Sequence, residues 1–217
     1  MNIEQARFNM IEQQIRPWDV LDQTVLALLA AVRREDFVPP AYKSMAFMDT
    51  EVPLGGGRFM LAPRLEARLL QELKLQRHEK VLEVGTGSGF MAALLGHKAQ
   101  QVISLELDPE LARSAADKLK HAGMNKVTVR QADGSKGLSG EAPFDAIVLS
   151  GSVAEIPDAL LQQLKIGGRL IAIRGEEPVM RAVLVTRLAE RDFRTVELFD
   201  TIAPRLQGFE EASRFSF

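Results

Sequence analysis

The sequence of 217 residues contains no cysteine, one tryptophan and one tyrosine. The lack of cysteine excludes disulfides, thiolate nucleophiles and cysteine-ligated metals. The longest apolar run, 25–32, is too short to span a bilayer. The N-terminus also lacks the basic start and apolar stretch of a signal peptide. We therefore expect a cytoplasmic protein that does not associate with membranes.

The sequence also lacks an excess of charge of either sign. Lysine and arginine number 27, aspartate and glutamate 29, and the net charge is −2. This balance provides no basic footprint for nucleic acid, so we expect no nucleic-acid partner. A hydrophobic content of 46% in a chain of this length suffices for one well-packed domain.

Residues 63 to about 175 alternate between strand and helix patterns. Helices separate most of the expected strands, and such an order favours right-handed crossovers and a parallel sheet. Two further strand patterns lie close together and predict an antiparallel pair at the sheet edge. The sequence thus predicts a doubly wound, mostly parallel, seven-stranded α/β fold of the Rossmann-like type. The expected strands are 81–84, 102–105, 127–129, 144–149, 169–173, 183–186 and 195–199, and the expected helices start at Pro63, Phe90, Pro109 and Pro157, the last running to 164.

Residues 1–60 have a different pattern, with two expected helices followed by an irregular region. A helical stripe over 1–15 ends before Pro17, and Asp22 can cap a second helix that runs to about 33. We predict a helical N-terminal extension over 1–60 and a ligand-binding domain over 61–217, packed as one compact unit. Trp18, Phe215 and Phe217 are interpreted as packing residues.

A glycine-rich turn follows the strand at 81–84. Its sequence is Gly85-Thr86-Gly87-Ser88-Gly89, and a helix begins at Phe90. Glycines allow a tight turn and a close approach of a ligand to the backbone. A dinucleotide site would need glycine or alanine where Phe90 stands, so a dehydrogenase is the least favoured interpretation. With Glu83 before it, the turn resembles that of S-adenosylmethionine-dependent methyltransferases, whose cofactor carries an ammonium group that a carboxylate can pair.

Acidic residues follow the next two strands at the sheet edge where ligands bind in doubly wound folds. Glu106 is placed to accept hydrogen bonds from a ribose diol. Asp133-Gly134 is placed to receive an adenine amino group. The predicted cofactor-binding residues are Glu83, Gly85, Thr86, Gly87, Ser88, Glu106, Leu107, Asp133, Gly134 and Ser150.

Several ordered blocks make the chain similar to the protein-L-isoaspartate O-methyltransferase family. They lie at 31–39, 46–57, 132–134, 141–147 and 164–170. The resemblance implies S-adenosyl-L-methionine as methyl donor, S-adenosyl-L-homocysteine as product and no metal. It also implies repair of an isoaspartyl protein or peptide by methylation of its free carboxylate. A carboxylate is ionised at pH 7 and needs no general base, so alignment and exclusion of water are the main tasks of such an enzyme.

One loop departs from the family pattern. After Gly57 the family reads Gln-Thr-Ile-Ser, and its serine is taken as catalytic, whereas this chain has Leu61 at that position. The catalytic residue is therefore unassigned. Two alternatives stay open: a methyltransferase with a different small or apolar acceptor, and a non-catalytic S-adenosylmethionine-binding protein. The sequence does not show the oligomeric state. Candidate substrate residues are Arg58, Phe59, Met60, Leu61 and Arg64, whose two arginines either bind a carboxylate or are solvated surface charges.

Overall fold

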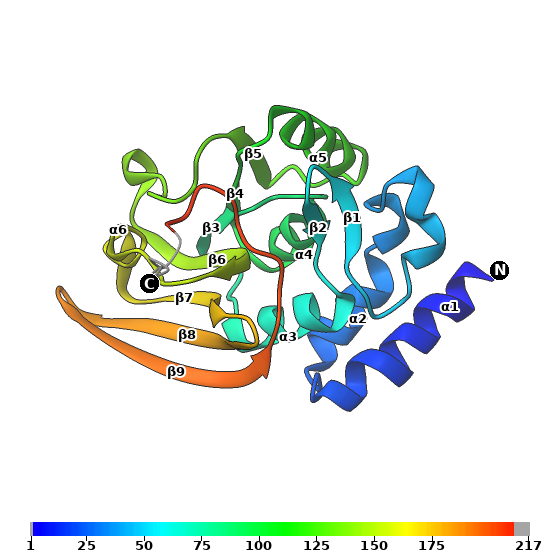
Figure 1. Cartoon of the computed structure of the whole chain (residues 1–217), viewed down its shortest axis with the longest axis horizontal. Helices are drawn as coiled ribbons and strands as arrows, with labels where there is room; N and C mark the ends of the chain where they lie inside the picture. The colour runs from blue at the N-terminus through cyan, green and yellow to red at the C-terminus, as the bar shows by residue number, and fades with distance from the viewer. Residues whose placement is uncertain (1, 211–217) are drawn as a thin grey trace, which may run out of the picture.

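The computed structural model describes residues 2–210, and its centre is a seven-stranded sheet of order β5-β4-β3-β6-β7-β8-β9 (Figure 1). The first five strands in this order pair in parallel, and β8 pairs antiparallel with both of its neighbours, β7 and β9. The predicted doubly wound sheet with an antiparallel C-terminal edge is confirmed. The strands are β3 (Lys80–Val84), β4 (Gln101–Glu106), β5 (Val127–Gln131), β6 (Phe144–Val153), β7 (Leu164–Glu176), β8 (Val179–Ala189) and β9 (Asp192–Thr201).

Side chains alternate between the two faces of the sheet and form two hydrophobic cores. Val81 and Val148 belong to the larger core, which includes buried residues of α2 (Gln23–Ala31), α3 (Pro63–Leu73) and α4 (Phe90–Lys98). Their neighbours Leu82 and Leu149 belong to the second core, together with Leu160 of α6 (Asp158–Leu161). The strands are thus buried on both faces, as their near-continuous apolar sequences indicate. Helix α5 (Pro109–His121) packs beside β5 and β4.

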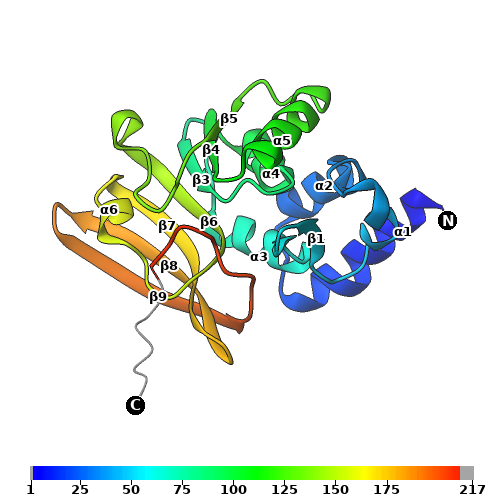
Figure 2. The same ribbon diagram turned by 45° about the horizontal axis from the view of Figure 1, so that its top comes forward.

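The N-terminal extension contributes residues to the larger core, and its helices lie beside α3 (Figure 2). Helix α1 (Ile3–Asn9) continues as a π-helical segment, η1 (Met10–Ile15), and a 3₁₀ turn, η2 (Arg16–Trp18). Asp22 caps α2 as predicted, since its side chain accepts hydrogen bonds from the amides of Thr24 and Val25. The 3₁₀ turns η3 (Arg34–Asp36) and η4 (Pro40–Met45) follow, and then a short hairpin of β1 (Val52–Gly55) and β2 (Arg58–Met60).

The helix predicted over 157–164 was wrong beyond Leu161. The residues after α6 join the sheet, because the carbonyl of Gln163 accepts a hydrogen bond of 2.8 Å from the amide of Phe144, and Leu164 pairs with Phe144. A 3₁₀ turn, η5 (Ser139–Glu141), precedes β6. No helix in the described part of the chain is long and apolar enough to cross a membrane.

Residues 203–209 form a segment that we name the C-terminal strap. It leaves the end of β9 and runs back across the sheet beside β6 (Figures 1 and 2). The amide of Ser152 donates to the carbonyl of Pro204 at 2.8 Å, and the amide of Leu206 donates to the carbonyl of Ser152 at 2.9 Å. Phe209 is buried in the second core. The strap is therefore fixed to β6 at one end and to the core at the other. Phe215 and Phe217 lie outside the described residues.

Candidate cofactor-binding and active site

A cavity lies at the carboxyl ends of the central strands, where the doubly wound fold predicts a ligand site. Its floor includes Gly85 and Gly87 of the glycine-rich turn, with Glu106 and Ser150 beside them. The free volume is about 60 Å³, which is room for only a few water molecules. The β1–β2 hairpin contributes Leu54, Arg58 and Phe59 to the lining, and the strap contributes Pro204, Arg205, Leu206 and Gln207.

The glycine-rich turn has the backbone conformation that its sequence requires. Gly85, Gly87 and Gly89 have φ angles of 92°, 52° and 89°, which residues with a side chain rarely adopt. Gly89 also allows two helices to approach, because a Cβ atom there would lie 3.3 Å from the Cβ of Ala115 on α5. Thr86 and Ser88 are buried and do not line the cavity. Ser88 accepts a hydrogen bond from the amide of Phe90 at the start of α4.

Glu106 lines the cavity at the end of β4, as predicted. Its side chain is only 5% exposed. One carboxylate oxygen accepts from the amide of Gly87 at 2.7 Å, and the other accepts from the amide of Asp108 at 3.1 Å. The carboxylate thus fixes the glycine-rich turn to the start of α5. Leu107, also predicted, lines the cavity and is 41% exposed.

Glu83 lies beneath the cavity and does not line it. Its carboxyl oxygens accept from the hydroxyls of Ser104 at 2.6 Å and Ser150 at 2.7 Å. Burial raises the pKa of Glu83 to about 8, despite these two hydrogen bonds, and the nearby carboxylates of Glu66 and Glu106 raise it further. Ser150 does line the cavity, so the hydroxyl of Ser150 connects the Glu83 carboxyl group to the cavity.

The segment after β5 brings Ala132 and Gly134 into the cavity wall. Gly134 packs so closely on β3 that a Cβ atom there would lie 2.3 Å from a methyl of Val84. Asp133 is exposed and is not part of the lining. Its carboxylate accepts from the amide of Ser135 at 2.9 Å and lies beside Gly208 of the strap.

The chain is similar in sequence to known proteins over most of its length. A family model described as protein-L-isoaspartate(D-aspartate) O-methyltransferase matches residues 5–197. The chain is 40% identical to protein-L-isoaspartate O-methyltransferase 1 of Syntrophobacter fumaroxidans, over 85% of this chain and 86% of that protein. It is 39% identical to the protein-L-isoaspartate O-methyltransferase of Rhodopseudomonas palustris, over 93% of each chain.

The chain belongs to the protein-L-isoaspartate O-methyltransferase family. Solved structures support the fold. One protein-L-isoaspartate O-methyltransferase superposes with a TM-score of 0.80 over 93% of this chain and 66% of its own, at 23% identity. A beta-aspartate methyltransferase from Plasmodium falciparum, in complex with S-adenosyl-L-homocysteine, superposes with the same TM-score of 0.80. The match covers 95% of this chain and 99% of that protein, at 21% identity.

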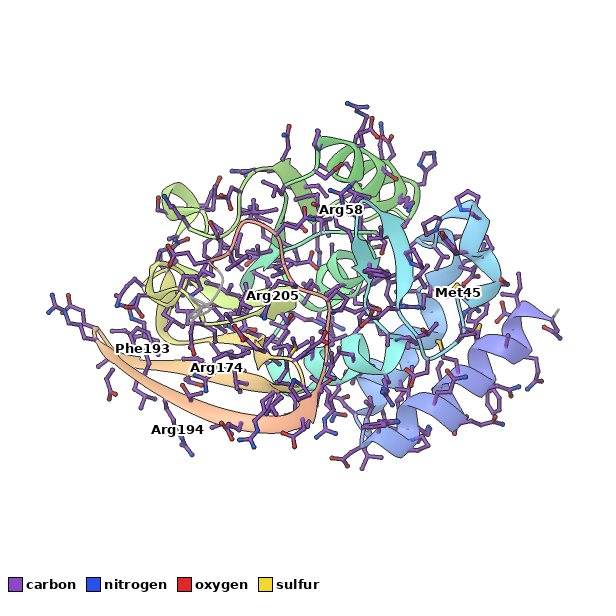
Figure 3. The ribbon with its side chains drawn as sticks, in the orientation of Figure 1. Met45, Arg58, Arg174, Phe193, Arg194 and Arg205 are labelled. Atoms are coloured by element: carbon purple, nitrogen blue, oxygen red, sulfur yellow. The ribbon has the colours of Figure 1, made fainter. Side chains whose placement is uncertain are left out.

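The loop after Gly57 that departs from the family pattern, residues 58–64, is named here the altered loop. Some of its side chains line the cavity and others pack in the core. Arg58, on the β1–β2 hairpin (Figure 3), and Phe59 line the cavity. Arg58 pairs with Asp108 at 2.9 Å. Met60 and Leu61 are each only 3% exposed and pack in the larger core. The chain therefore presents no hydroxyl from position 61 to the cavity. Of the candidate substrate residues in this loop, Arg58 and Phe59 thus line the cavity, whereas Met60 and Leu61 do not.

Arg64 lies away from the cavity. It pairs with Asp49 at 3.1 Å, and its guanidinium carbon lies 3.8 Å from the centre of the Trp18 ring. Each of the two arginines has an acidic partner, and their side chains are 28% and 37% exposed, so both are partly solvated members of ion pairs. Binding of a substrate carboxylate by either arginine stays a prediction. Trp18 is 50% exposed and belongs to neither hydrophobic core, and its ring packs against Arg64.

The strap was missed as part of the site. Leu206 lies on the glycine-rich turn, since a Cβ atom on Gly85 would be 2.5 Å from a methyl of Leu206. Gly151 is equally close to the strap, with the carbonyl oxygen of Pro204 at 3.0 Å from its Cβ position. The glycine at 151, within a strand, is the one signal of such a close approach in the sequence.

Proposed function

We propose that the protein transfers a methyl group from S-adenosyl-L-methionine to the free carboxylate of an isoaspartyl residue in a protein or peptide. The observation that carries the proposal is Glu106 beside the glycine-rich turn, in a cavity at the carboxyl edge of the sheet. Family membership over most of the chain supports the same activity.

The residues around the cavity fit the proposed cofactor. We assign the ribose hydroxyls of the cofactor to Glu106 and its adenine to Ala132 and Gly134, all three of which line the cavity. We assign the amino-acid part of the cofactor to Gly85, Gly87 and Ser150, with Glu83 acting on its ammonium group through Ser150. Thr86 and Ser88 would act by shaping the turn. Because the free volume is small, the hairpin or the strap must move for the cofactor to enter.

The proposed reaction is a single displacement. The acceptor carboxylate, ionised at pH 7, attacks the methyl carbon, and the carbon–sulfur bond breaks with its electron pair left on sulfur. The products are a methyl ester and S-adenosyl-L-homocysteine. The contribution of the protein is to align the oxygen, carbon and sulfur atoms and to exclude water. Arg58 and Phe59, at the cavity, are the candidates for orienting the acceptor.

We further propose that this family member acts without the family's serine, whose position is occupied by Leu61. Burial of Leu61 supports a role for this side chain in packing. A methyltransferase with a different, apolar acceptor is the second candidate, and the apolar Phe59 in the cavity wall favours it. A non-catalytic binding protein has no such observation in its favour.

The test is transfer of labelled methyl from S-adenosyl-L-methionine to an isoaspartyl peptide, with the matching aspartyl peptide as control. Cofactor binding is measured in the same sample by isothermal titration. Transfer to the isoaspartyl peptide alone would support the proposed activity without a serine. Confirmed binding of the cofactor with no transfer to either peptide would contradict it and favour the second candidate.

The remaining sequence-based expectations stay predictions. They are the cytoplasmic location, the absence of a metal and of nucleic-acid or membrane partners, and the division into an extension over 1–60 and a domain over 61–217.

A further inference from the structure

A second cavity, which we name the Trp18 groove, lies where three distant parts of the chain meet. It is lined by residues that include Trp18 of the extension, Arg64 and Arg68 of α3, Val179 and Phe199 of the C-terminal strands, and Ile202. Its free volume is about 500 Å³, within the range of about 300–1,000 Å³ that is typical of ligand pockets. It is therefore large enough to hold side chains of a bound partner.

The walls of the groove are held by specific contacts. Arg68 donates to the carbonyl of Trp18 at 2.8 Å and pairs with Asp19 at 3.3 Å and Glu72 at 3.0 Å. The guanidinium carbon of Arg64 lies 3.8 Å from the centre of the Trp18 ring, a position that is favourable for a cation over an aromatic face. Arg64 thus packs on the indole, and Arg68 holds the backbone of Trp18.

The groove offers three exposed apolar side chains to a partner, beside the polar Asp200 and Thr201. Val179 is 64% exposed, Ile202 51% and Trp18 50%. Exposed apolar side chains scattered singly are ordinary, whereas apolar and aromatic side chains gathered in one cavity with a few polar groups are characteristic of ligand pockets. Both arginines of the wall already have acidic partners, Asp49 for Arg64 and Asp19 with Glu72 for Arg68. The groove therefore fits an aromatic or large aliphatic side chain better than an acidic group.

Two chain segments connect the groove to the cofactor cavity. Ile202 lines the groove and Pro204 lines the cavity, and two residues of chain span at most about 7 Å. On the other side, Phe59 lines the cavity and Arg64 lines the groove. A ligand with a reacting carboxylate in the cavity and a side chain in the groove needs only a few residues of extended backbone. A polypeptide acceptor meets this condition.

We propose that the Trp18 groove binds the acceptor polypeptide beside its isoaspartyl residue and selects an aromatic or large aliphatic side chain there. The proposal rests on the proposed function, because the acceptor carboxylate must reach the cofactor cavity. It makes Trp18, Val179 and Ile202 determinants of substrate preference in this chain.

The experiment compares isoaspartyl peptides that carry phenylalanine at one of three positions on either side of the isoaspartyl residue with the peptide that has glycine there. We expect kcat/KM to rise about tenfold or more for at least one phenylalanine position, as burial of an apolar side chain predicts. Binding is followed independently through the emission of Trp18, the single tryptophan of the chain, with S-adenosyl-L-homocysteine present.

Two groove variants, Trp18→Ala and Val179→Asp, are compared with Leu188→Ala. Leu188 is 50% exposed on β8 and lines neither cavity, so it is a matched control for loss of exposed apolar surface. We expect the ratio of kcat/KM for the phenylalanine peptide to kcat/KM for the glycine peptide to fall toward one in both groove variants. In the Leu188→Ala control this ratio should stay as in the wild type. Val179→Asp changes an exposed side chain, so the test stands even if Trp18→Ala destabilises the fold.

An unchanged ratio in folded groove variants would overturn the proposal, as would a wild-type protein with neither a preference for phenylalanine nor a change in Trp18 emission. The absence of transfer to every peptide would instead contradict the proposed function. In that case the emission of Trp18 tests whether the groove binds the peptide, independently of methyl transfer. A saturable shift with the phenylalanine peptide that Val179→Asp abolishes would support the groove, and the lack of a shift would refute it.

Discussion

Glu83 combines complete burial with two serine hydrogen bonds, so its ionisation is tied to the stability of the fold. Burial raises its pKa from an ordinary 4.5 to about 8. The protonated form is therefore favoured in the folded protein and the ionised form in the unfolded chain. The stability contributed by this protonation is fully present below pH 4.5 and is lost as the pH rises to about 8.

We predict that Glu83→Gln reduces the loss of stability between pH 5 and pH 8. One pKa unit corresponds to about 1.4 kcal/mol, so the penalty for ionised Glu83 is on the order of several kcal/mol. The neutral amide of glutamine does not ionise and keeps hydrogen-bonding capacity toward both serines. The check is the free energy of unfolding in urea at a series of pH values. Parallel curves for the wild type and the variant would contradict the pKa assignment.

Glu106 acts at the cavity itself. We predict that Glu106→Ala weakens binding of S-adenosyl-L-homocysteine by about 1–3 kcal/mol, the usual effect of removing hydrogen bonds to a charged group. The change also removes the acceptor of the Gly87 and Asp108 amides, so the turn loses a support. Isothermal titration measures the effect, and an unchanged dissociation constant would reject the role of Glu106 in binding.

The sequence predicted the part of the site that depends on local order along the chain. Glycines and acids that directly follow strands, such as Gly85 and Glu106, are carried to the cavity by the parallel topology itself. Asp133 follows a strand as well, yet its side chain accepts from the amide of Ser135 and lies outside the lining. The contacts of Leu206 and Trp18 depend on tertiary packing between distant segments, which no local pattern encodes.

At the scale of elements, an ion pair joins the β1–β2 hairpin to the start of α5, in addition to the packing of Val52 and Met60 in the larger core. Arg58 pairs with Asp108, and the two side chains are 28% and 21% exposed. Asp108 is also the N-cap of α5, since it accepts from the amides of Glu110 and Leu111. The pKa of Asp108 is lowered, first by the hydrogen bond from Leu111 and also by Arg58. Asp108 thus caps α5 and also binds the hairpin through its ion pair with Arg58.

We predict that Asp108→Asn speeds the release of S-adenosyl-L-homocysteine by up to about fivefold, because an ion pair near the surface is weak and its loss loosens the hairpin only modestly. Asparagine is as good an N-cap as aspartate, so the melting temperature is expected to stay nearly unchanged. Stopped-flow displacement of the bound product measures the rate. Asp22→Asn, at the cap of α2 away from the cavity, is the control. Release no faster than in this control would show that the ion pair does not hold the hairpin closed.

Most elements were predicted from the sequence, because apolar runs and proline or glycine punctuation mark their ends. All seven strands of the sheet were predicted, although several are longer in the structure, since pairing extends a strand beyond its apolar centre. The π-helical turn over Met10–Ile15 and the early end of α6 were not predicted. The early end of α6 depends on pairing with a distant residue, as the bond between Gln163 and Phe144 shows.

At the scale of the whole molecule, the N-terminal extension and the sheet share one core and a buried ion pair. Arg34 is 1% exposed and pairs with Glu66 of α3, which is 3% exposed. Arg34 also donates to the carbonyl of Leu61 at 2.7 Å and lies over the Phe90 ring at 4.8 Å. It therefore joins the extension to the altered loop and to α4. Burial raises the pKa of Glu66 to about 7, although Arg34 acts in the opposite direction.

We predict that Arg34→Leu lowers the free energy of unfolding by about 3–5 kcal/mol, the usual cost of removing one member of a buried pair. The double variant Arg34→Leu, Glu66→Leu removes both charges and should recover part of this loss, but not all, because the carbonyl of Leu61 still lacks its donor. Both variants should unfold in one transition if the extension and the sheet form one cooperative unit. Urea denaturation followed by far-ultraviolet circular dichroism and by Trp18 fluorescence tests this, since Trp18 lies in the extension and the dichroism reports the whole chain. Two separated transitions, or a double variant no more stable than the single one, would show that the pair does not couple the two parts.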